Sequence, residues 1–378
     1  MSKKLHILFL CGWFPSRVLP TNGDFIERHA KAVSHKHKVT ILHIISDENC
    51  NQKIEIVSEK KDELNIHIAY IKKTKNPLKK ILLYRKAFLS LLKHIGDFDV
   101  VHLNKLYPFG IFTLYLKKTR KKQFIITEHF TGYHLPLSKN ISFLEKFISK
   151  KIAKSAAFIC PVSNNLKDAM QQLGFKGNYT RIPNVVDTNL FVPSESKNSV
   201  FTISHISNMV NPHKNIEGLL QVIKNLEAKL VNFKVEIIGE NSSKYITFAT
   251  KIGINLNNVT FIDQIPHKEI ANRLQNSDLF ILFSNYENLP CVILESFSCG
   301  VPVISTDVGG INEYFPDDFG KLIQRNNQEE LLESILSFEK SFKTKTLNKQ
   351  KMHNYVINNF SESKIALEFE KLYFKSLK

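Results

Sequence analysis

The sequence predicts an α/β protein built from two Rossmann-like, doubly wound domains that face a central cleft. Three observations lead to this prediction. Short apolar runs typical of buried strands alternate with longer amphipathic segments, and this alternation occurs twice. A proline followed by a polar stretch separates the two series. The length of 378 residues suits two or three domains.

Six apolar runs in the first half are expected to be strands. Nearly continuous apolar runs separated by helical segments are typical of parallel strands that helices cover on both faces, so we place a first domain at residues 1–190. The runs are Leu5–Cys11, Val39–Ile45, Ile66–Ile71, Val100–Leu103, Phe124–Thr127 and Phe158–Val162.

Five further runs form the second series and place a second domain at residues 195–358. The polar stretch from Ser194 to Ser199 suits a linker between the domains. The tail is expected to form two helices with a break near residues 358–361, the last of which (about 360–378) packs back on the first domain. The runs are Phe201–Ser204, Val235–Ile238, Val259–Ile262, Leu279–Phe283 and Val303–Ser305.

Composition excludes several classes of protein. The five cysteines are odd in number and show no CxxC spacing, which argues against a disulfide framework or a zinc site and favours the reducing cytoplasm. No stretch approaches the roughly 20 apolar residues that span a bilayer. The N-terminal apolar run is too short for a signal peptide and is better explained as a buried strand.

The charge is unevenly distributed. Residues 1–190 hold 32 Lys and Arg against 14 Asp and Glu, whereas residues 191–378 hold 20 against 21. Between Lys72 and Gly96 there are eight basic residues and no acidic one. One half is therefore strongly basic and the other neutral, so we expect the two halves to face different partners.

A helix over about 78–95 is expected to carry part of this charge. Lys79, Lys86 and Lys93 recur every seven residues and form one stripe, while Ile81, Leu82, Phe88, Leu89, Leu92 and Ile95 lie mainly on another side. The lysines suit an anionic membrane surface. They also suit a Rossmann helix with its apolar face on the sheet and its lysines in water. No nucleic acid is expected, because no aromatic-interleaved basic motif accompanies the charge.

The most informative segment is residues 286–306, YENLPCVILESFSCGVPVIST. Glu287 lies in a loop after the predicted strand Leu279–Phe283, and Glu295 lies in the helix that we expect to open near Pro290. The carboxyl ends of strands in open α/β sheets are where ligands bind. Asp307-Val308-Gly309-Gly310 follows as a second glycine turn, expected to open another helix at the same edge.

This segment resembles the retaining glycosyltransferases of the GT-B fold, glycosyltransferase family four. Their hallmark is two glutamates eight apart in a Glu-x-x-Leu-Pro…Glu…Gly-x-Pro-Val setting, and all of these anchors are present here. The resemblance implies that Glu287 holds hydroxyls of a donor sugar and that Glu295 accepts hydrogen bonds from a nucleotide ribose. Asn288, Leu289 and Pro290 would shape the sugar pocket.

Lys214 is the candidate for binding the donor diphosphate. It follows the first strand of the second domain, and we expect it at the start of a helix over Asn215–Leu226, where a cation and a helix N-terminus both favour phosphate. The family usually places an arginine five residues earlier, and here that position is Met209. His213 or a basic residue of the first domain could supply the second positive charge that this arginine provides in the family.

In the first domain, candidate residues follow the strands. The resemblance assigns Gly23 to a loop whose backbone approaches the donor phosphate, and His129 to a position near the reacting sugar. A neutral imidazole there could bond a sugar hydroxyl, and a charged one could stabilise the leaving group. Glu128 could bind a hydroxyl of the acceptor substrate, act as a base, or be a carboxylate at a helix N-terminus. His102 could be a residue on the acceptor side of the site or a core residue.

The implied reaction moves a sugar from a nucleotide diphosphate sugar to a hydroxyl of a glycan or lipid-linked acceptor, with retention of configuration. No metal or other cofactor is expected, because no DxD-like motif is present. The basic half favours an acceptor near the membrane, as in bacterial surface polysaccharide assembly, and a cytoplasmic enzyme peripheral to the inner face of the membrane. The alternatives are a nucleotide-sugar epimerase of the same fold and a non-catalytic protein that binds membranes or nucleic acid. The donor base, the sugar, the acceptor and the oligomeric state stay open.

Overall fold

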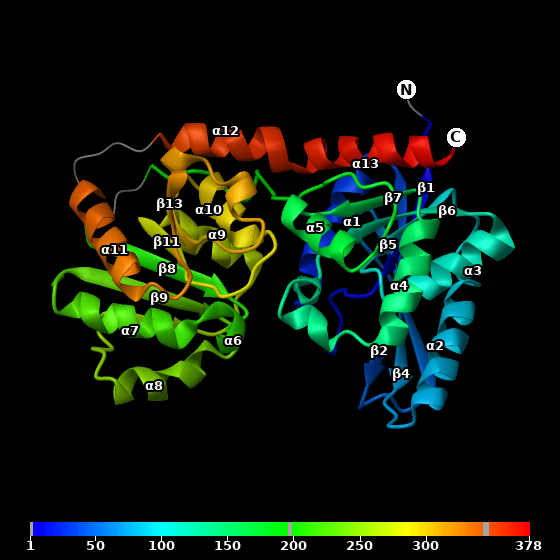
Figure 1. Ribbon diagram of the computed structural model, residues 1–378, viewed down its shortest axis with the longest axis horizontal. Coiled ribbons are helices and arrows are strands. Elements are labelled where there is room, and N and C mark those ends of the chain that lie inside the picture. The colour runs from blue at the N-terminus through cyan, green and yellow to red at the C-terminus, as the bar shows by residue number, and fades with distance from the viewer. Residues whose placement is uncertain (1–2, 196–198, 343–347) are drawn as a thin grey trace. The chain divides into compact units, whose positions relative to one another are not determined.

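The structure of the protein, a computed structural model, describes residues 3–195, 199–342 and 348–378 (Figure 1). The chain divides into two compact units. Unit 1 comprises Met1–Val185 and Glu362–Lys378, and unit 2 comprises Val186–Ser361. Each unit is a helix-covered, mainly parallel sheet, which confirms the predicted fold class.

The sheet of unit 1 has seven strands in the order β3-β4-β2-β1-β5-β6-β7. All neighbouring pairs are parallel except β3 and β4, which form an antiparallel hairpin. The six predicted strands are all present. The strands are β1 (His6–Cys11), β2 (Lys38–Asp47), β3 (Ile54–Lys61), β4 (Leu64–Lys72), β5 (Val100–Asn104), β6 (Gln123–Glu128) and β7 (Phe158–Pro161).

Helices cover both faces of this sheet. α1 and α13 pack together, and their apolar side chains share one core with β1 and β2. α2 and α3 lie side by side, with the rings of Phe88 and Phe112 stacked at 4.1 Å, and α3 contacts α4. The helices are α1 (Asp24–Ser34), α2 (Pro77–Leu91), α3 (Gly110–Arg120), α4 (Phe143–Ser155), α5 (Asn164–Gln172) and α13 (Glu362–Ser376), with 3₁₀ turns η1 (Thr131–Tyr133) and η2 (Leu137–Asn140).

α2 corrects the prediction for residues 78–95. The helix ends at Leu91, so Lys93 lies beyond it. Phe88 and Leu92 are buried as expected, but Ile81 and Leu82 are 63% and 55% exposed. The first turns of α2 therefore carry apolar side chains that no core covers. The predicted apolar stripe is core only in its second half.

The sheet of unit 2 has six parallel strands in the order β10-β9-β8-β11-β12-β13. The five predicted strands are present, and β13 is additional. The strands are β8 (Phe201–Ser207), β9 (Phe233–Gly239), β10 (Val259–Ile262), β11 (Leu279–Leu282), β12 (Val303–Thr306) and β13 (Gly320–Ile323).

The helices of unit 2 enclose a second core around β8, β9 and β11. No helix opens directly after the glycine turn at 309–310, contrary to prediction, and only a 3₁₀ turn follows. The helices are α6 (Asn211–Lys214), α7 (Ile216–Glu227), α8 (Ile246–Lys251), α9 (His267–Gln275), α10 (Cys291–Ser298), α11 (Gln328–Phe342) and α12 (Lys349–Phe360), with 3₁₀ turns η3 (Ser242–Tyr245), η4 (Asn312–Tyr314) and η5 (Asp317–Phe319).

The chain passes between the units twice, after Val185 and after Ser361. The backbone N–H of Val186 donates to the Phe360 carbonyl at 2.9 Å, and Val186 forms a parallel β-bridge with Ser361. The two passages are thus hydrogen-bonded to each other. Part of the predicted linker, residues 196–198, lies outside the described residues.

Candidate active site

The loop after β11 carries the central carboxylate of unit 2. Glu287 is 8% exposed and forms an ion pair with the Lys214 ammonium. The Ser284 hydroxyl donates to the same Glu287 oxygen at 2.7 Å. Two residues predicted for the donor site, Lys214 and Glu287, are therefore in direct contact at the carboxyl edge of the sheet, where open α/β sheets bind ligands.

A glycine turn supports this loop from the next strand. Gly309 has φ of 64°, and a Cβ on it would lie 1.9 Å from the Glu287 carbonyl oxygen. The Gly310 N–H donates to the Asn288 carbonyl at 2.9 Å, and the Thr306 hydroxyl donates to the Ser284 carbonyl at 2.6 Å. The turn that the sequence places after β12 thus fixes the backbone on both sides of Glu287.

Lys214 reaches the loop by a route that differs from the prediction. It is the last residue of the short helix α6, and not the first of the following helix. Asn215, in the left-handed region at φ 51°, separates α6 from α7. The Asn285 N–H donates to the His213 carbonyl at 2.6 Å, which ties the end of α6 to the loop before Glu287.

Glu295 is 3% exposed in α10. His267 of α9 lies 3.7 Å from its carboxylate. Pro290 is the N-cap of α10, so the helix opens next to Pro290 as predicted, and Leu289 before it is buried. Glu287 thus lies in the loop and Glu295 in the helix, as predicted.

The structure explains why Met209 cannot be simply exchanged for arginine. Its side chain is completely buried in the unit 2 core, and its sulfur accepts a hydrogen bond from the Ser207 hydroxyl. A different cation lies near the site. The exposed Arg325 guanidinium, in the loop after β13, is 5.8 Å from the centre of the Tyr286 ring, next to Glu287. The neighbouring Asn326 accepts a hydrogen bond from Asn215 at 3.4 Å. Sequence reasoning missed Arg325 because β13 was not predicted.

In unit 1, Gly23 holds the loop after β1. It is the N-cap of α1 with φ of 79°, and a Cβ there would lie 2.7 Å from the Trp13 carbonyl carbon. Only glycine fits this approach without strain. Gly23 therefore keeps the start of α1 against the Trp13 backbone at the carboxyl edge of the sheet.

His129 lies at the same edge, directly after β6. Its ring packs against Phe25 at 4.4 Å and His29 at 5.4 Å. Burial lowers the pKa of the His129 imidazole well below its usual value, and the neighbouring His29 and His102 act in the same direction. Of the two predicted roles, this environment favours a neutral ring that exchanges hydrogen bonds with a sugar hydroxyl.

Glu128 and His102 are both fully buried. Glu128 accepts backbone hydrogen bonds from Leu106, His129 and Phe130 at 2.8–2.9 Å. These contacts indicate a role that was not among the three predicted for Glu128, that of a side chain that organises the loop backbone.

The contacts of His102 favour the core interpretation over an acceptor role. Its ring nitrogens hydrogen-bond to the Tyr373 hydroxyl at 2.7 Å and the Thr127 hydroxyl at 2.5 Å. Tyr373 belongs to α13, so His102 connects the sheet to that helix within unit 1.

A basic–aromatic cluster at this edge was missed by sequence reasoning. The Lys105 ammonium lies 4.0 Å from the centre of the Trp13 ring and 4.8 Å from that of Phe130. Each of the three residues follows the end of a different strand. The sequence could have pointed to Trp13, the single tryptophan of the chain, but the meeting of all three depends on which strands are neighbours.

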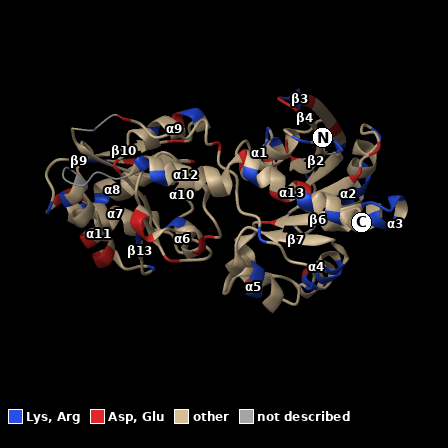
Figure 2. Cartoon of the chain, turned by 90° about the horizontal axis from the view of Figure 1, so that it is seen from above, with Lys and Arg blue, Asp and Glu red and all other residues tan. Residues whose placement is uncertain are grey.

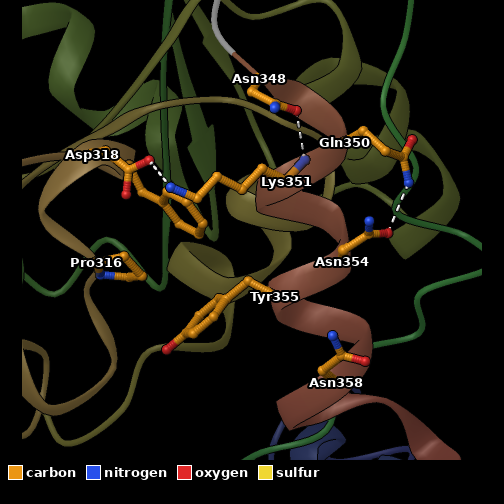
Figure 3. Close-up of a pocket in the computed structure, with 9 residues that line it drawn as sticks. Pro316, Asp318, Asn348, Gln350, Lys351, Asn354, Tyr355 and Asn358 are labelled. Carbon is orange, nitrogen blue, oxygen red and sulfur yellow. Dashed lines mark hydrogen bonds and ion pairs between the residues drawn. The ribbon is translucent and has the colours of Figure 1, made fainter.

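A surface hollow of about 720 Å³ lies elsewhere on unit 2, along one side of α12 (Figure 3). The Lys351 ammonium donates to Asp318 at 2.5 Å, and the Gln350 amide donates to Asn354 at 2.9 Å. None of the predicted donor residues lines it. These polar groups already pair with one another, so the hollow is not the candidate active site.

Two family models match the chain, one for each series of strands. The model described as Glycosyl transferases group 1 matches residues 193–359, and the model described as Glycosyltransferase Family 4 matches residues 25–190. Together they cover most of the sequence, including Lys214, Glu287 and Glu295. The chain belongs to this family of GT-B glycosyltransferases.

Individual relatives are more distant. One subunit of the phosphatidylinositol N-acetylglucosaminyltransferase of Arabidopsis thaliana is 29% identical over 52% of this chain and 44% of its own length. TuaC of Bacillus subtilis, assigned to teichuronic acid biosynthesis, is 23% identical over 64% of this chain and 61% of its own length. The chain thus spans about half the length of these relatives.

The fold similarity spans nearly the whole chain. The structure of Anabaena HepE in complex with UDP matches with a TM-score of 0.74 at 15% identity, covering 98% of this chain and all of that one. Among the described residues, no helix is both long and apolar enough to cross a membrane.

Proposed function

We propose that this protein is a retaining glycosyltransferase that transfers a sugar from a nucleotide diphosphate sugar to a hydroxyl of a glycan or lipid-linked acceptor. The observation that carries the proposal is the largely buried ion pair between Lys214 of α6 and Glu287, whose loop Ser284 and Gly309 hold in place. An ion pair shielded from water contributes little to the free energy of unfolding. The presence of this pair is therefore better explained by a role in binding a polar ligand.

The donor is bound by residues of unit 2. Glu287 accepts hydrogen bonds from the donor sugar, and Glu295 accepts them from the ribose, because a carboxylate can take several hydroxyl donors. Lys214 and Arg325 face the diphosphate. Lys214 is already neutralised by Glu287, so the second cation is needed to balance two phosphates. A UDP-bound neighbour of the same fold makes uridine nucleotides the first donors to test.

The chemistry we propose is front-face transfer. The bond between the anomeric carbon and the diphosphate oxygen breaks, and the acceptor oxygen bonds to the same face of that carbon. The acceptor proton passes to the departing diphosphate, so no protein carboxylate has to act as nucleophile. The chain supplies position and charge: Lys214 and Arg325 stabilise the leaving diphosphate, and His129 orients a sugar hydroxyl. Neither a metal ion nor another cofactor takes part in this scheme.

We further propose that unit 1 docks on an anionic membrane. Leu78, Ile81 and Leu82 of α2, Ile111 of α3, Leu135, and Phe143, Leu144 and Phe147 of α4 are all exposed, with Phe143 at 86%. We call this set the apolar rim. The helices α2, α3 and α4, which carry most of the apolar rim, also carry two or more lysines each (Figure 2). Apolar side chains flanked by lysines are typical of surfaces that insert into anionic interfaces.

The position of the apolar rim supports a lipid-linked or membrane-proximal acceptor. α2, α3 and α4 follow the parallel strands β4, β5 and β6, so their first turns lie at the carboxyl edge of the sheet. Lys105 and His129 lie at that same edge. A docked unit 1 would therefore direct this edge of its sheet to the bilayer on the inner face of the cell membrane. A relative assigned to teichuronic acid biosynthesis supports a bacterial surface polysaccharide as the product.

Donor binding and hydrolysis test the proposal. We would titrate UDP-, GDP-, ADP- and dTDP-sugars by calorimetry and follow their hydrolysis, with and without EDTA. We expect Glu295→Ala and Arg325→Ala each to weaken nucleotide binding about 10–100-fold, since each removes contacts of a charged group. Glu287→Ala should mainly reduce turnover, and EDTA should change nothing.

The exposed Glu333→Ala on α11 is the matched control and should behave as the wild type. Full activity of both the Glu287 and the Glu295 variants would refute the assignment. Donor turnover into a new nucleotide sugar without an acceptor would indicate an epimerase. Absence of any nucleotide affinity in the folded protein would indicate a non-catalytic anion-binding protein.

A further inference from the structure

Lys105 is held in an unusual backbone conformation at the carboxyl edge of unit 1. It directly follows β5 with φ of 70°, in the left-handed region that side chains rarely adopt. Its N–H donates to the Thr127 carbonyl at 3.1 Å. A Cβ on Gly12 would lie 3.1 Å from the Lys105 Cβ, so the β1 loop also packs against it. Such strain is maintained at functional sites more often than elsewhere.

The ammonium of Lys105 has aromatic neighbours but no acceptor. Its contacts with Trp13 and Phe130 are to ring faces, which attract a cation without offering a lone pair. Among the described residues it makes no hydrogen bond and no ion pair. Its two acidic neighbours are not within bonding distance, and one of them, Glu128, is occupied by three backbone N–H groups. Burial lowers the pKa of the Lys105 ammonium.

A largely buried ammonium in a folded protein is normally paired, because desolvating an unpaired charge is costly. Lys105 has three N–H donors and shares the sheet edge with Gly23 and His129. The rings of Trp13 and Phe130 and the backbone of Lys105 fix the position of the ammonium before any ligand binds. An anion at this point would complete the arrangement with little ordering of the protein.

We propose that Lys105 is the anion-recognition residue of the acceptor subsite and binds a phosphate or carboxylate carried by the acceptor. This inference rests on the proposed function, because only a transferase needs an acceptor. A phosphate could come from a lipid headgroup or a phosphorylated glycan, and a carboxylate from an acidic sugar. The aromatic rings orient the cation, and the acceptor hydroxyl is thereby positioned relative to a fixed charge.

Trp13 is the single tryptophan of the chain, so its fluorescence reports directly on the Lys105 ammonium. We would titrate the full-length protein at constant ionic strength with inorganic phosphate, with methyl glucuronide, and with vesicles. The vesicles contain phosphatidylcholine alone or equimolar phosphatidylcholine and phosphatidylglycerol. Lys105→Met keeps the length of the side chain without its charge, and Lys105→Arg keeps the charge. Lys340→Met removes an exposed lysine of α11 in unit 2, away from the apolar rim and its lysines, and is the matched control.

We expect at least one anion to change the emission saturably in the wild type. Lys105→Met should lower that affinity about 10–100-fold, the loss typical of one charge-assisted contact, while Lys105→Arg and Lys340→Met retain it. Comparing midpoints rather than amplitudes removes the effect of the substitution on Trp13 itself. A response to phosphatidylglycerol vesicles alone identifies a lipid headgroup, and a response to the soluble probes identifies an anionic glycan.

Unchanged affinity in Lys105→Met, or no response of the wild type to any probe, would overturn the inference. Calorimetry with donor nucleotides on the same samples separates the two proposals. Donor binding without an anion response at Trp13 removes the acceptor subsite and leaves the proposed function standing. An anion response without any donor affinity removes the acceptor role together with the transferase.

Discussion

Gly309 shows how one residue without a side chain controls the candidate donor site. Its backbone is in the left-handed region at φ 64°, and the space that a Cβ would need is occupied by the Glu287 carbonyl. Its neighbour Gly310 holds the Asn288 carbonyl. The carboxylate of Glu287 can meet Lys214 only while this turn keeps its shape.

We therefore predict that Gly309→Ala, like loss of Glu287 itself, impairs turnover more than it impairs folding. The left-handed conformation alone costs an alanine about 1–2 kcal/mol, and the clash must also displace the loop around Glu287. Thermal unfolding should show a moderate loss of stability, while the turnover of the donor should fall at least tenfold.

Gly96→Ala provides the control, because a Cβ at Gly96 meets no atom within 4 Å. It should change stability by less than about 0.5 kcal/mol and leave turnover unaltered. Equal turnover of the two alanine variants would show that the Gly309 turn does not position Glu287.

Residue patterns reveal some members of the site and hide others for a physical reason. Glu287 and Lys214 could be found because each lies in a distinctive local segment at the end of a strand. Lys105 and Arg325 could not, because their importance comes from contacts with residues distant in the sequence, Trp13 and Tyr286. Such contacts depend on strand order, which local patterns do not specify.

At the scale of elements, strands buried on both faces were the easiest to predict. β3 was missed because it is an edge strand with mostly exposed residues, and β13 because it is four residues long with a single buried one. Helices were predicted where they cover the sheet. The first turns of α2 were misjudged because apolar residues there face solvent, and periodicity alone cannot tell a core face from a docking face.

The first turn of α4 offers a direct test of membrane docking. We predict that Phe143→Ser combined with Leu144→Ser lowers affinity for anionic vesicles by at least tenfold. Insertion of each such side chain into an apolar phase is worth about 1.5–3 kcal/mol. Co-sedimentation with vesicles at several salt concentrations measures the affinity.

Val231→Ser is a suitable comparison, since Val231 is an apolar residue of unit 2 that is 92% exposed and lies outside the apolar rim. It should leave vesicle binding as it was. If the Phe143–Leu144 double variant sediments like the wild type, the apolar rim does not insert into the bilayer.

At the scale of the whole molecule, unit 1 is discontinuous in sequence. α13 contributes Ile365, Phe369 and Tyr373 to the core of unit 1, and Glu370 is 3.0 Å from the Lys36 ammonium. The Tyr373 hydroxyl bonds His102 in the middle of the sheet. The last helix is thus an integral part of the unit that begins the chain.

We predict that Phe369→Ala destabilises unit 1 selectively. Deleting a fully buried phenylalanine typically costs about 3–5 kcal/mol. Hydrogen exchange followed by mass spectrometry should show faster exchange in β1, β5 and α1, with β8 and β11 unchanged. Nucleotide affinity should persist, because its residues lie in unit 2. Uniformly faster exchange in both units would contradict the independence of the two cores.

The return of the chain to unit 1 also has a consequence for biosynthesis. A ribosome completes all of unit 2 before it makes α13, so unit 2 can fold while the core of unit 1 still lacks one wall. During that interval the groove that α13 later fills exposes apolar side chains of α1 and the sheet. The first half of the protein therefore matures last. Chaperone dependence, degradation of incomplete chains and stop codons that remove α13 should all act on unit 1.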